Sequence, residues 1–433
     1  MRVSFKTLGC RLNQFETDAL VSEFDRKGYE IVDFKSKSDI TVINTCTVTG
    51  QSDHKSRNLI QQAIKANPGT TVVVTGCMAE QYKEGLEKIK GVSLVINNKN
   101  KSGISDTVEH FINKTADNRP KVNQFTYQPV QKSLHTRAAI KIQDGCDNMC
   151  TFCIIPQVRG RAISRPANEI IKNIKQTIAN GFKEIVITGV NIGRYYHNGV
   201  RFINLIQQVL EIPGDFRVRV SSLEPDGFDS DFIKLFENPK LTPHLHLCLQ
   251  SGSDQILLKM RRMYDLDIFV NFTTKLLKKY PDFNLTTDII VGFPQETDAH
   301  FKDSLNIVKQ IGFSHVHTFK YSIRKGTVAE RMQNQVDEKI KTTRSEELRN
   351  LVEQNKHKYY ESFIGKSEKV LVEKHLGDNW YFGYGEHYIP ITFKSPINLK
   401  NQFIDIKIDG LEGGKRLMLK GVIKDLHLVK KLK

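Results

Sequence analysis

Apolar and polar residues alternate along residues 1–113 in a pattern that predicts strands joined by helices. Runs of β-branched and apolar residues predict strands that end near Cys10, Cys46 and Cys77. After the first run, apolar residues recur at helical spacing, and we expect Asn13 to be the N-cap of this helix. Helical connections between strands imply a mainly parallel sheet, so this part of the chain is predicted to be an α/β domain.

Residues 114–136 are polar, contain two prolines and show no sustained period, which predicts a linker. A second βα series occupies residues 137–363. Its predicted strands lie near 138–143, 185–188, 217–222, 244–250, 287–291 and 315–321. Six βα-type units predict an open, partial barrel whose chemistry lies at the carboxyl ends of the strands.

The fourth predicted strand of this series alternates strictly between polar residues and leucines. His244, His246, Cys248 and Gln250 fall on one face, which would point into the barrel. An isolated interior histidine is more often a hydrogen-bonded core residue than a ligand, and we interpret Cys248 as structural too.

Short alternating runs separated by glycine and charged turns fill residues 366–433 and predict a small β-barrel. This tail holds 13 Lys and Arg against 8 Asp and Glu, a net charge of +5. The whole chain of 433 residues carries a formal net charge of +16, which favours polyanionic partners, above all nucleic acid. A merely soluble basic protein would show the same balance.

Composition excludes several other classes of protein. Hydrophobic residues make up 39% of the chain, enough for buried cores, and no apolar run approaches the roughly 18 residues that cross a bilayer. The N-terminus has no apolar signal core. We therefore expect a cytoplasmic protein without a membrane partner.

Three of the seven cysteines follow predicted strands of the first domain. The carboxyl ends of parallel strands share one edge of a sheet, where ligands usually bind, so Cys10, Cys46 and Cys77 are predicted to converge there. The alternative is three separate buried thiols, because free cysteine is among the most buried residue types.

Cys146, Cys150 and Cys153 form a C-x₃-C-x₂-C triplet directly after the first strand of the barrel series. Structural zinc normally takes four protein ligands, and no fourth cysteine or histidine lies nearby in the sequence. An iron–sulfur cubane held by three cysteines would keep one iron open for substrate. The spacing favours a cluster over zinc.

The triplet and its surroundings, GCDNMCTFCIIPQVRGRAISRP, resemble the methylthiotransferase branch of the radical S-adenosylmethionine (SAM) enzymes. The resemblance covers the whole chain and implies three parts: an N-terminal methylthiotransferase domain, a partial βα barrel of the radical SAM type, and a TRAM module, a small RNA-binding β-barrel. Within this branch, TLGCRLNQFET and TGVNIGRY most resemble the MtaB group. That group modifies N6-threonylcarbamoyladenosine beside the tRNA anticodon.

The resemblance implies two [4Fe–4S] clusters with S-adenosyl-L-methionine as radical source and methyl donor. Cys146, Cys150 and Cys153 would hold the radical SAM cluster, and Cys10, Cys46 and Cys77 an auxiliary cluster that presents sulfur. Further residues at the strand ends would contact the cofactor. They are Thr188, Gly189, Val190, Ser222, Glu224, Gln250, Ser251, Val291 and Gly292. Alternatively, these glycines would form tight turns between strands and helices, and these polar residues would cap helices.

The implied partners are the anticodon stem-loop of tRNA, an electron donor and a sulfur source, the last two unidentified by the sequence, and we expect a monomer. Three alternatives remain open. They are the same chemistry on N6-isopentenyladenosine of tRNA, the same chemistry on a ribosomal protein side chain, and a non-catalytic RNA-binding protein with a structural metal.

Overall fold

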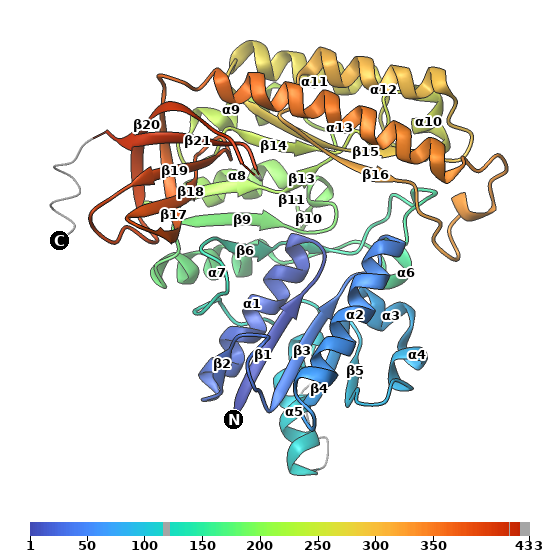
Figure 1. The fold of residues 1–433 in the computed structure, drawn as a ribbon, viewed down its shortest axis with the longest axis vertical. Helices are drawn as coiled ribbons and strands as arrows, with labels where there is room; N and C mark the ends of the chain where they lie inside the picture. Colours follow the sequence, from blue (N-terminus) through green and yellow to red (C-terminus); the bar gives the residue numbers. More distant parts are fainter. Residues whose placement is uncertain (116–121, 415, 425–433) are drawn as a thin grey trace. The chain divides into compact units, whose positions relative to one another are not determined.

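The structure of the protein, a computed structural model, describes residues 1–115, 122–414 and 416–424 (Figure 1). The chain divides into two compact units. Unit 1 comprises Met1–Gly181, Val186–Val209 and Ser322–Arg331, and unit 2 comprises Phe182–Ile185, Leu210–Tyr321 and Met332–Lys433. Among the helices of the described residues, none is both long and apolar enough to cross a membrane.

Unit 1 begins with a five-stranded sheet in the order β2-β1-β3-β4-β5, in which all pairs are parallel. The strands are β1 (Arg2–Thr7), β2 (Glu30–Val32), β3 (Ile40–Thr45), β4 (Thr71–Gly76) and β5 (Leu94–Ile96). The helices that connect and follow them are α1 (Arg11–Arg26), α2 (Gly50–Ala66), α3 (Cys77–Gln81), α4 (Lys83–Glu87) and α5 (Ile104–Asn113). The edge strands β2 and β5 are short and were not predicted.

Two hydrophobic cores lie on the two faces of this sheet, because successive side chains of a strand point to opposite faces. Val72 and Val74 of β4 pack in one core with Ile60 of α2. Val73 packs in the other core with Phe24 of α1. Helices therefore cover both faces, and the sheet leaves its carboxyl edge for ligands, as predicted for an α/β domain.

The rest of unit 1 carries the start of the second βα series. Its elements are β6 (Ala138–Lys141), β7 (Gln143–Asp144), α6 (Ile155–Arg159), β8 (Ile163–Ser164), α7 (Ala167–Ala179), the end of β9 (Glu184–Thr188), β10 (Tyr196–His197), β11 (Val200–Arg201) and most of α8 (Phe202–Leu210). Within the predicted linker, residues 116–121 lie outside the described residues. Its later part packs on α1, because Ser22 Oγ donates to the Lys132 carbonyl at 2.6 Å.

Unit 2 contains a parallel sheet of four strands in the order β13-β14-β15-β16. The strands of this unit before residue 330 are β12 (Arg217–Val220), β13 (Ser222–Leu223), β14 (His244–Leu247), β15 (Asn284–Val291) and β16 (His315–Lys320). The helices are α9 (Ser230–Lys234), α10 (Asp254–Lys259), α11 (Leu266–Lys279), α12 (Asp298–Ile311) and α13 (Glu338–Glu361). Leu245, Leu247 and Leu249 are fully buried, as their alternation predicted.

The C-terminal strands of unit 2, red in Figure 1, form a closed barrel in the order β17-β18-β19-β21-β20. They are β17 (Ser367–Gly377), β18 (Trp380–Tyr384), β19 (Pro390–Lys394), β20 (Phe403–Glu412) and β21 (Met418–Ile423). The predicted fold class is confirmed: an α/β chain with an N-terminal parallel sheet and a small C-terminal barrel.

Strand β18 is the one barrel strand that the sequence did not predict. Its aromatic run does not alternate with polar residues, so it lacks the period-two signal. Tyr381 is buried in the barrel core, whereas Trp380 is half-buried with the Nζ atoms of Lys394 and Lys420 at 5.1 and 5.5 Å from its ring centroid. Part of the run therefore belongs to the barrel core, whereas the half-buried Trp380 lies beside two lysine side chains.

Candidate functional site

The three N-terminal cysteines, here called the dispersed group, are Cys10, Cys46 and Cys77. Cys10 directly precedes α1, Cys46 directly follows β3, and Cys77 is the first residue of α3. Burial raises the pKa of Cys46 to about 11, and the nearby thiols of Cys77 and Cys10 add to the rise. Burial also raises the pKa of Cys77. The fold thus brings the three thiols together at the carboxyl edge of the sheet.

Two glycines with positive φ let the loops of the dispersed group approach each other. A Cβ atom at Gly76, whose φ is +98°, would lie 2.3 Å from the Thr45 carbonyl oxygen. A Cβ atom at Gly9, whose φ is +99°, would lie 2.9 Å from Cys46 Cβ. Both the left-handed conformation and the lack of space require glycine here.

Asn13 has a different role from the predicted one. Helix α1 begins at Arg11, with Cys10 at the N-cap position, so the prediction of Asn13 as N-cap is wrong. Instead, Asn13 Nδ2 donates to the carbonyls of Leu8 at 2.8 Å and Thr45 at 3.0 Å. These bonds hold together the two strand ends that lead into Cys10 and Cys46.

Cys146, Cys150 and Cys153, here called the contiguous group, lie on one loop between β7 and α6, and all three are half-buried. The Asn148 N–H lies 3.5 Å from Cys146 Sγ, and the Ile155 N–H lies 3.5 Å from Cys153 Sγ. Backbone N–H groups directed at sulfur stabilise thiolates, the form that binds metal.

Helix α6 connects the two cysteine groups inside unit 1. It begins at Ile155, two residues after Cys153, and its residue Val158, together with Ile154, packs against Cys77. A displacement of the contiguous loop would therefore be felt at the dispersed group, because packed side chains transmit small shifts.

A cluster of buried charges centred on Glu16 of α1 lies beside the dispersed group. Lys101 Nζ donates to Glu16 Oε2 at 2.5 Å, Lys141 Nζ donates to Oε1 at 3.0 Å, and Arg159 also donates to Oε1 at 3.0 Å. Burial by itself would raise the pKa of Glu16, but these three cations outweigh it and lower the pKa well below its usual value. Glu16 is therefore a buried carboxylate that stays ionised.

Arg159, the last residue of α6, extends this network to both cysteine loops. Its guanidinium donates to Asn13 Oδ1 at 2.7 Å and to Asp144 Oδ1 at 3.0 Å, and its side chain is 1% exposed. Burial raises the pKa of Cys77, and the positive charge of Arg159 opposes that rise. Sequence reasoning missed these roles, although Glu16 and Arg159 both lie inside the quoted motif strings.

The spacing of the thiols bears on the kind of metal that they fit. Sulfur ligands of one tetrahedral zinc ion, each about 2.3 Å from the metal, lie roughly 4 Å apart. Among the described residues, neither cysteine group has all three of its sulfur atoms within 4.8 Å of one another. In each group at least one pair of sulfur atoms therefore lies farther apart than one tetrahedral zinc ion requires, which leaves room for a multi-iron cluster.

The first set of predicted cofactor residues follows β9. Gln143 Oε1 accepts hydrogen bonds from the N–H groups of Val190 at 3.0 Å and Asn191 at 2.9 Å. A Cβ atom at Gly189 would lie 2.7 Å from the Gln143 carbonyl oxygen, and Thr188 is buried. Gln143, which was not predicted as a site residue, fixes the backbone of this segment.

The second set belongs to unit 2. Glu224 Oε1 accepts from Arg262 at 2.6 Å, and Ser222 on β13 is exposed. Gln250 has a φ of +68° after β14, and Ser251 is fully buried. A left-handed conformation at a non-glycine residue is uncommon and marks a backbone shaped by its surroundings.

The third set, also in unit 2, ends β15. Gly292 has a φ of +71°, and its N–H donates to Glu296 Oε2 at 2.6 Å, while Arg344 holds that same oxygen at 2.7 Å. A Cβ atom at Gly292 would lie 2.2 Å from Lys341 Cγ, and Val291 is fully buried. Only glycine fits this turn.

Two family models and a solved structure match parts of this chain. The family model "Uncharacterized protein family UPF0004" matches residues 2–97, and that of the Radical SAM superfamily matches residues 140–308. A solved structure of the radical SAM methyltransferase TsrM from Kitasatospora setae aligns with a TM-score of 0.56 at 13% identity, covering 76% of this chain and 77% of that chain. This likeness concerns the fold alone, and the family model over residues 140–308 confirms the predicted radical SAM type.

Two relatives match over nearly the whole chain. The threonylcarbamoyladenosine tRNA methylthiotransferase MtaB of Bacillus subtilis is 35% identical over 94% of this chain and 93% of its own length. The tRNA-2-methylthio-N(6)-dimethylallyladenosine synthase of Fusobacterium nucleatum is 36% identical over 94% of this chain and 97% of its own length.

The fold and the cysteine loop define a radical SAM enzyme. The chain belongs to the family of radical SAM tRNA methylthiotransferases. Membership implies SAM and a [4Fe–4S] cluster as cofactors and tRNA as substrate.

Proposed function

We propose that the protein adds a methylthio group to C2 of N6-threonylcarbamoyladenosine at position 37, beside the anticodon in the anticodon stem-loop of tRNA. The observation that carries this proposal is the presence of two three-cysteine groups in unit 1, joined through α6 and Arg159. A methylthio insertion requires one centre for radical generation and another for sulfur, and two groups of three thiols match that requirement.

Cys146, Cys150 and Cys153 would hold the radical SAM cluster, and the dispersed group would hold an auxiliary [4Fe–4S] cluster. When bound, these clusters and SAM supply one-electron cleavage of the sulfonium, the methyl group and the sulfur, because such chemistry belongs to cofactors rather than side chains. Three thiols per cluster would keep one iron open in each, since full ligation takes four.

The protein's own residues would position these groups and keep water out. Gln143 fixes the backbone of 189–191, and Gly292 and Glu296 shape the turn after β15, where the adenine of the cofactor would lie. Ser222, Glu224, Gln250 and Ser251 would contact its methionyl or ribose part. Arg159 and Lys101 would hold positive charge beside the auxiliary cluster, whose thiolates carry negative charge.

Support for the threonylcarbamoyl substrate comes from the TLGCRLNQFET and TGVNIGRY segments and from relatives such as the Bacillus subtilis protein. Relatives named for dimethylallyladenosine match at similar identity, so the identity values by themselves favour neither substrate. A tRNA substrate would place the activity in the cytoplasm. An electron donor and a sulfur source complete the reaction, and we infer a monomer.

The barrel of β17–β21 would contribute to tRNA binding as a TRAM module. Half-buried Trp380, flanked by Lys394 and Lys420, combines an aromatic face with two cations. Aromatic stacking on unpaired bases and lysine contacts to phosphates are the usual means of binding single-stranded loops of RNA.

Mass spectrometry of nucleosides from total tRNA, with and without this gene, tests the proposal. We expect 2-methylthio-N6-threonylcarbamoyladenosine to disappear without the gene, and to return with the wild-type chain but not with Cys146→Ala or Cys10→Ala. Loss of the isopentenyl derivative instead would keep the chemistry and reject the substrate. No change in any tRNA nucleoside would reject the proposed function.

A further inference from the structure

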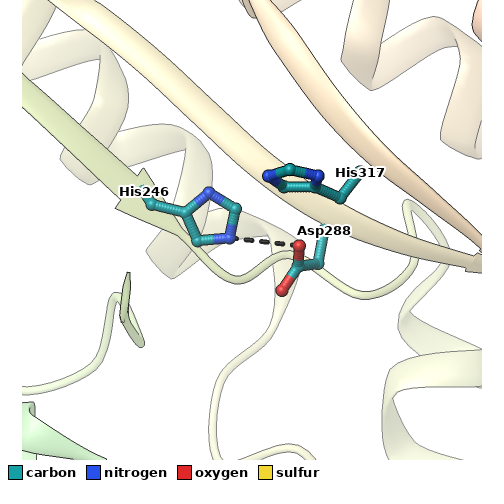
Figure 2. A group of neighbouring side chains, drawn as sticks. All are labelled: His246, Asp288 and His317. Carbon is teal, nitrogen blue, oxygen red and sulfur yellow. Dashed lines mark ion pairs between the residues drawn. The ribbon is translucent and has the colours of Figure 1, made fainter. Parts of the chain in front are cut away.

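Three side chains that project from neighbouring strands of unit 2 meet on one face of its four-stranded sheet. They are His246 of β14, Asp288 of β15 and His317 of β16 (Figure 2). His246 Nε2 lies 3.2 Å from Asp288 Oδ1, and the ring centroids of His246 and His317 are 5.5 Å apart. Figure 2 shows the three side chains pointing toward one another.

Neighbouring side chains hold the two histidines of the cluster in place through hydrogen bonds to their Nδ1 atoms. His246 Nδ1 lies 3.0 Å from the hydroxyl of Thr286, and His317 Nδ1 lies 3.3 Å from His315 Nε2. Burial lowers the pKa of His315 to about 3, so this imidazole is neutral at physiological pH. These partners orient both rings, and the other ring nitrogen of His246, Nε2, faces Asp288.

Asp288 stays ionised in this setting. Burial alone would raise its pKa, but the imidazole of His246, which also hydrogen-bonds the carboxylate, and that of His317 outweigh burial, and the pKa is lowered. The side chains of His246 and Asp288 are 12% and 23% exposed, and His317 is exposed, so a ligand can reach them. The cluster therefore offers a carboxylate acceptor and imidazole donors side by side.

The same strands carry the predicted cofactor residues of unit 2. His246 lies four residues before Gln250 on the β14 segment, and Asp288 lies three residues before Val291 on β15. The Gln250 N–H donates to the Asp288 carbonyl oxygen at 2.8 Å, and Val291 lies roughly 10 Å beyond Asp288 along β15, so the cluster directly adjoins the predicted cofactor residues. The fully buried Leu245 and Leu247 occupy the opposite face of the same strand, so the cluster faces away from the covering helices.

We propose that this cluster binds the polar N6 substituent of the target adenosine and so selects threonylcarbamoyl over isopentenyl. The proposal rests on the proposed function. A threonylcarbamoyl group carries a carboxylate that accepts from imidazole, and a hydroxyl and an amide N–H that donate to Asp288. An isopentenyl group has none of these groups, so it would cover the carboxylate and the imidazoles without offering them a hydrogen bond.

Selection would follow because the two kinds of mismatch between site and substrate differ in energetic cost. A site built to hydrogen-bond a substrate rejects an analogue that lacks those groups far more strongly than an apolar pocket rejects an added polar group. Phe319, which lies on the same face of β16 as His317 and is 40% exposed, adds an aromatic surface next to the cluster. A purine base can stack on such a surface.

The test compares two anticodon stem-loop RNAs of identical sequence, one with threonylcarbamoyladenosine and one with isopentenyladenosine at position 37. The holoenzyme with reconstituted clusters is assayed for methylthio product and for 5′-deoxyadenosine with each RNA. The variants are His317→Leu and the double variant His246→Leu/Asp288→Leu, which removes both members of the ion pair and leaves no single charge unpartnered. His357→Leu, a half-exposed histidine on α13 paired with Glu361, is the matched control.

We expect both cluster variants to lose about tenfold to a hundredfold in kcat/KM for the threonylcarbamoyl RNA, the loss typical of hydrogen bonds to charged groups. Their kcat/KM for the isopentenyl RNA should stay level or rise, with unchanged iron content and thermal stability. His357→Leu should behave as wild type.

Three results would overturn the proposal. An equal loss with both RNAs would assign the cluster a general structural role. An additional divalent metal ion found in the wild-type holoenzyme and lost in the double variant would make the cluster a metal site. A wild-type enzyme that acts only on the isopentenyl RNA would reject the proposed function together with this inference, whereas an unchanged preference in the variants would reject the inference alone.

Discussion

Cys146, Cys150 and Cys153 come from a single loop, whereas Cys10, Cys46 and Cys77 come from the ends of three different strands. The contiguous group is half-buried and receives backbone N–H groups on its sulfurs. The dispersed group combines one exposed thiol with two buried ones, and ionised side chains lie beside it. One group is built by local spacing and the other by the whole N-terminal sheet.

This difference determines which substitutions should disrupt each cysteine group. Substitutions outside its loop should leave the contiguous group largely intact. The dispersed group depends on tight loop contacts and on a buried charge network that includes residues from α1, α6 and β6. The following predictions separate the two groups by experiment.

The largest effect is expected for the cysteines themselves. Cys150→Ala should abolish both SAM cleavage and methylthio product, because the proposed radical SAM cluster would lose a ligand. Cys46→Ala should abolish the product while 5′-deoxyadenosine continues to form. Liquid chromatography of 5′-deoxyadenosine and of RNA nucleosides from the same reactions measures both. Loss of SAM cleavage in Cys46→Ala as well would mean that the two groups do not work separately.

Removal of the buried guanidinium should be the next largest effect. Arg159→Gln leaves Asp144 and Glu16 with one cation fewer, and breaking a buried ion pair costs about 3–5 kcal/mol of the free energy of unfolding. It should also lower the reduction potential of the proposed auxiliary cluster, because a nearby positive charge stabilises the added electron. Urea unfolding and a redox titration followed by electron paramagnetic resonance measure the two effects.

Arg161→Gln is the control for this prediction. Arg161 lies on the same segment, but its side chain is 79% exposed and pairs with half-exposed Asp147. An exposed pair contributes about 1 kcal/mol or less. Equal destabilisation by the two variants would contradict the importance of the buried network.

After removal of the clusters under reducing conditions, thiol alkylation should distinguish the groups again. The pKa of Cys46 is raised to about 11, so its reactive thiolate is scarce at pH 8 and increases about tenfold per pH unit until the pH nears that value. Against an ordinary thiol of pKa about 8.5, Cys46 should react roughly a hundredfold more slowly at pH 8. Peptide mass spectrometry after iodoacetamide treatment gives the rates, and alkylation of Cys46 as fast as that of half-buried Cys150 would contradict the prediction.

The smallest effect is expected at the glycines. Gly76→Ala adds a methyl group 2.3 Å from the Thr45 carbonyl oxygen and strains a positive φ, which should cost about 1–3 kcal/mol of stability and loosen the dispersed group. Gly160→Ala also has a positive φ, but nothing lies within 4 Å of the added atom, so only the strain of about 1–2 kcal/mol remains. Thermal unfolding and iron content of the two variants test the difference. A smaller loss of stability in Gly76→Ala than in Gly160→Ala would contradict it.

Much of the fold was predictable because its signals are local. The period-two leucines at 245, 247 and 249 predicted their burial, and strand–helix alternation predicted the parallel sheet. Strand β18 was missed because an unbroken aromatic run has no such period. The N-cap at Asn13 was mispredicted because its side chain bonds to two neighbouring strand ends rather than to its own helix.

By itself, the sequence determined the contiguous cysteine loop and the order of the three parts, because these depend on spacing and periodicity along the chain. The class of protein followed from the resemblance of its motifs to a known family. Only the tertiary structure decided which buried charges surround Cys77 and which histidines meet Asp288. Glu16 and Lys101 are far apart along the chain, and so are His246 and His317. Nothing in the sequence distinguishes these residues from other charged or polar residues, and only folding brings them together. Their ionisation and hydrogen bonding depend on burial and on distance, and both quantities exist only in the folded chain.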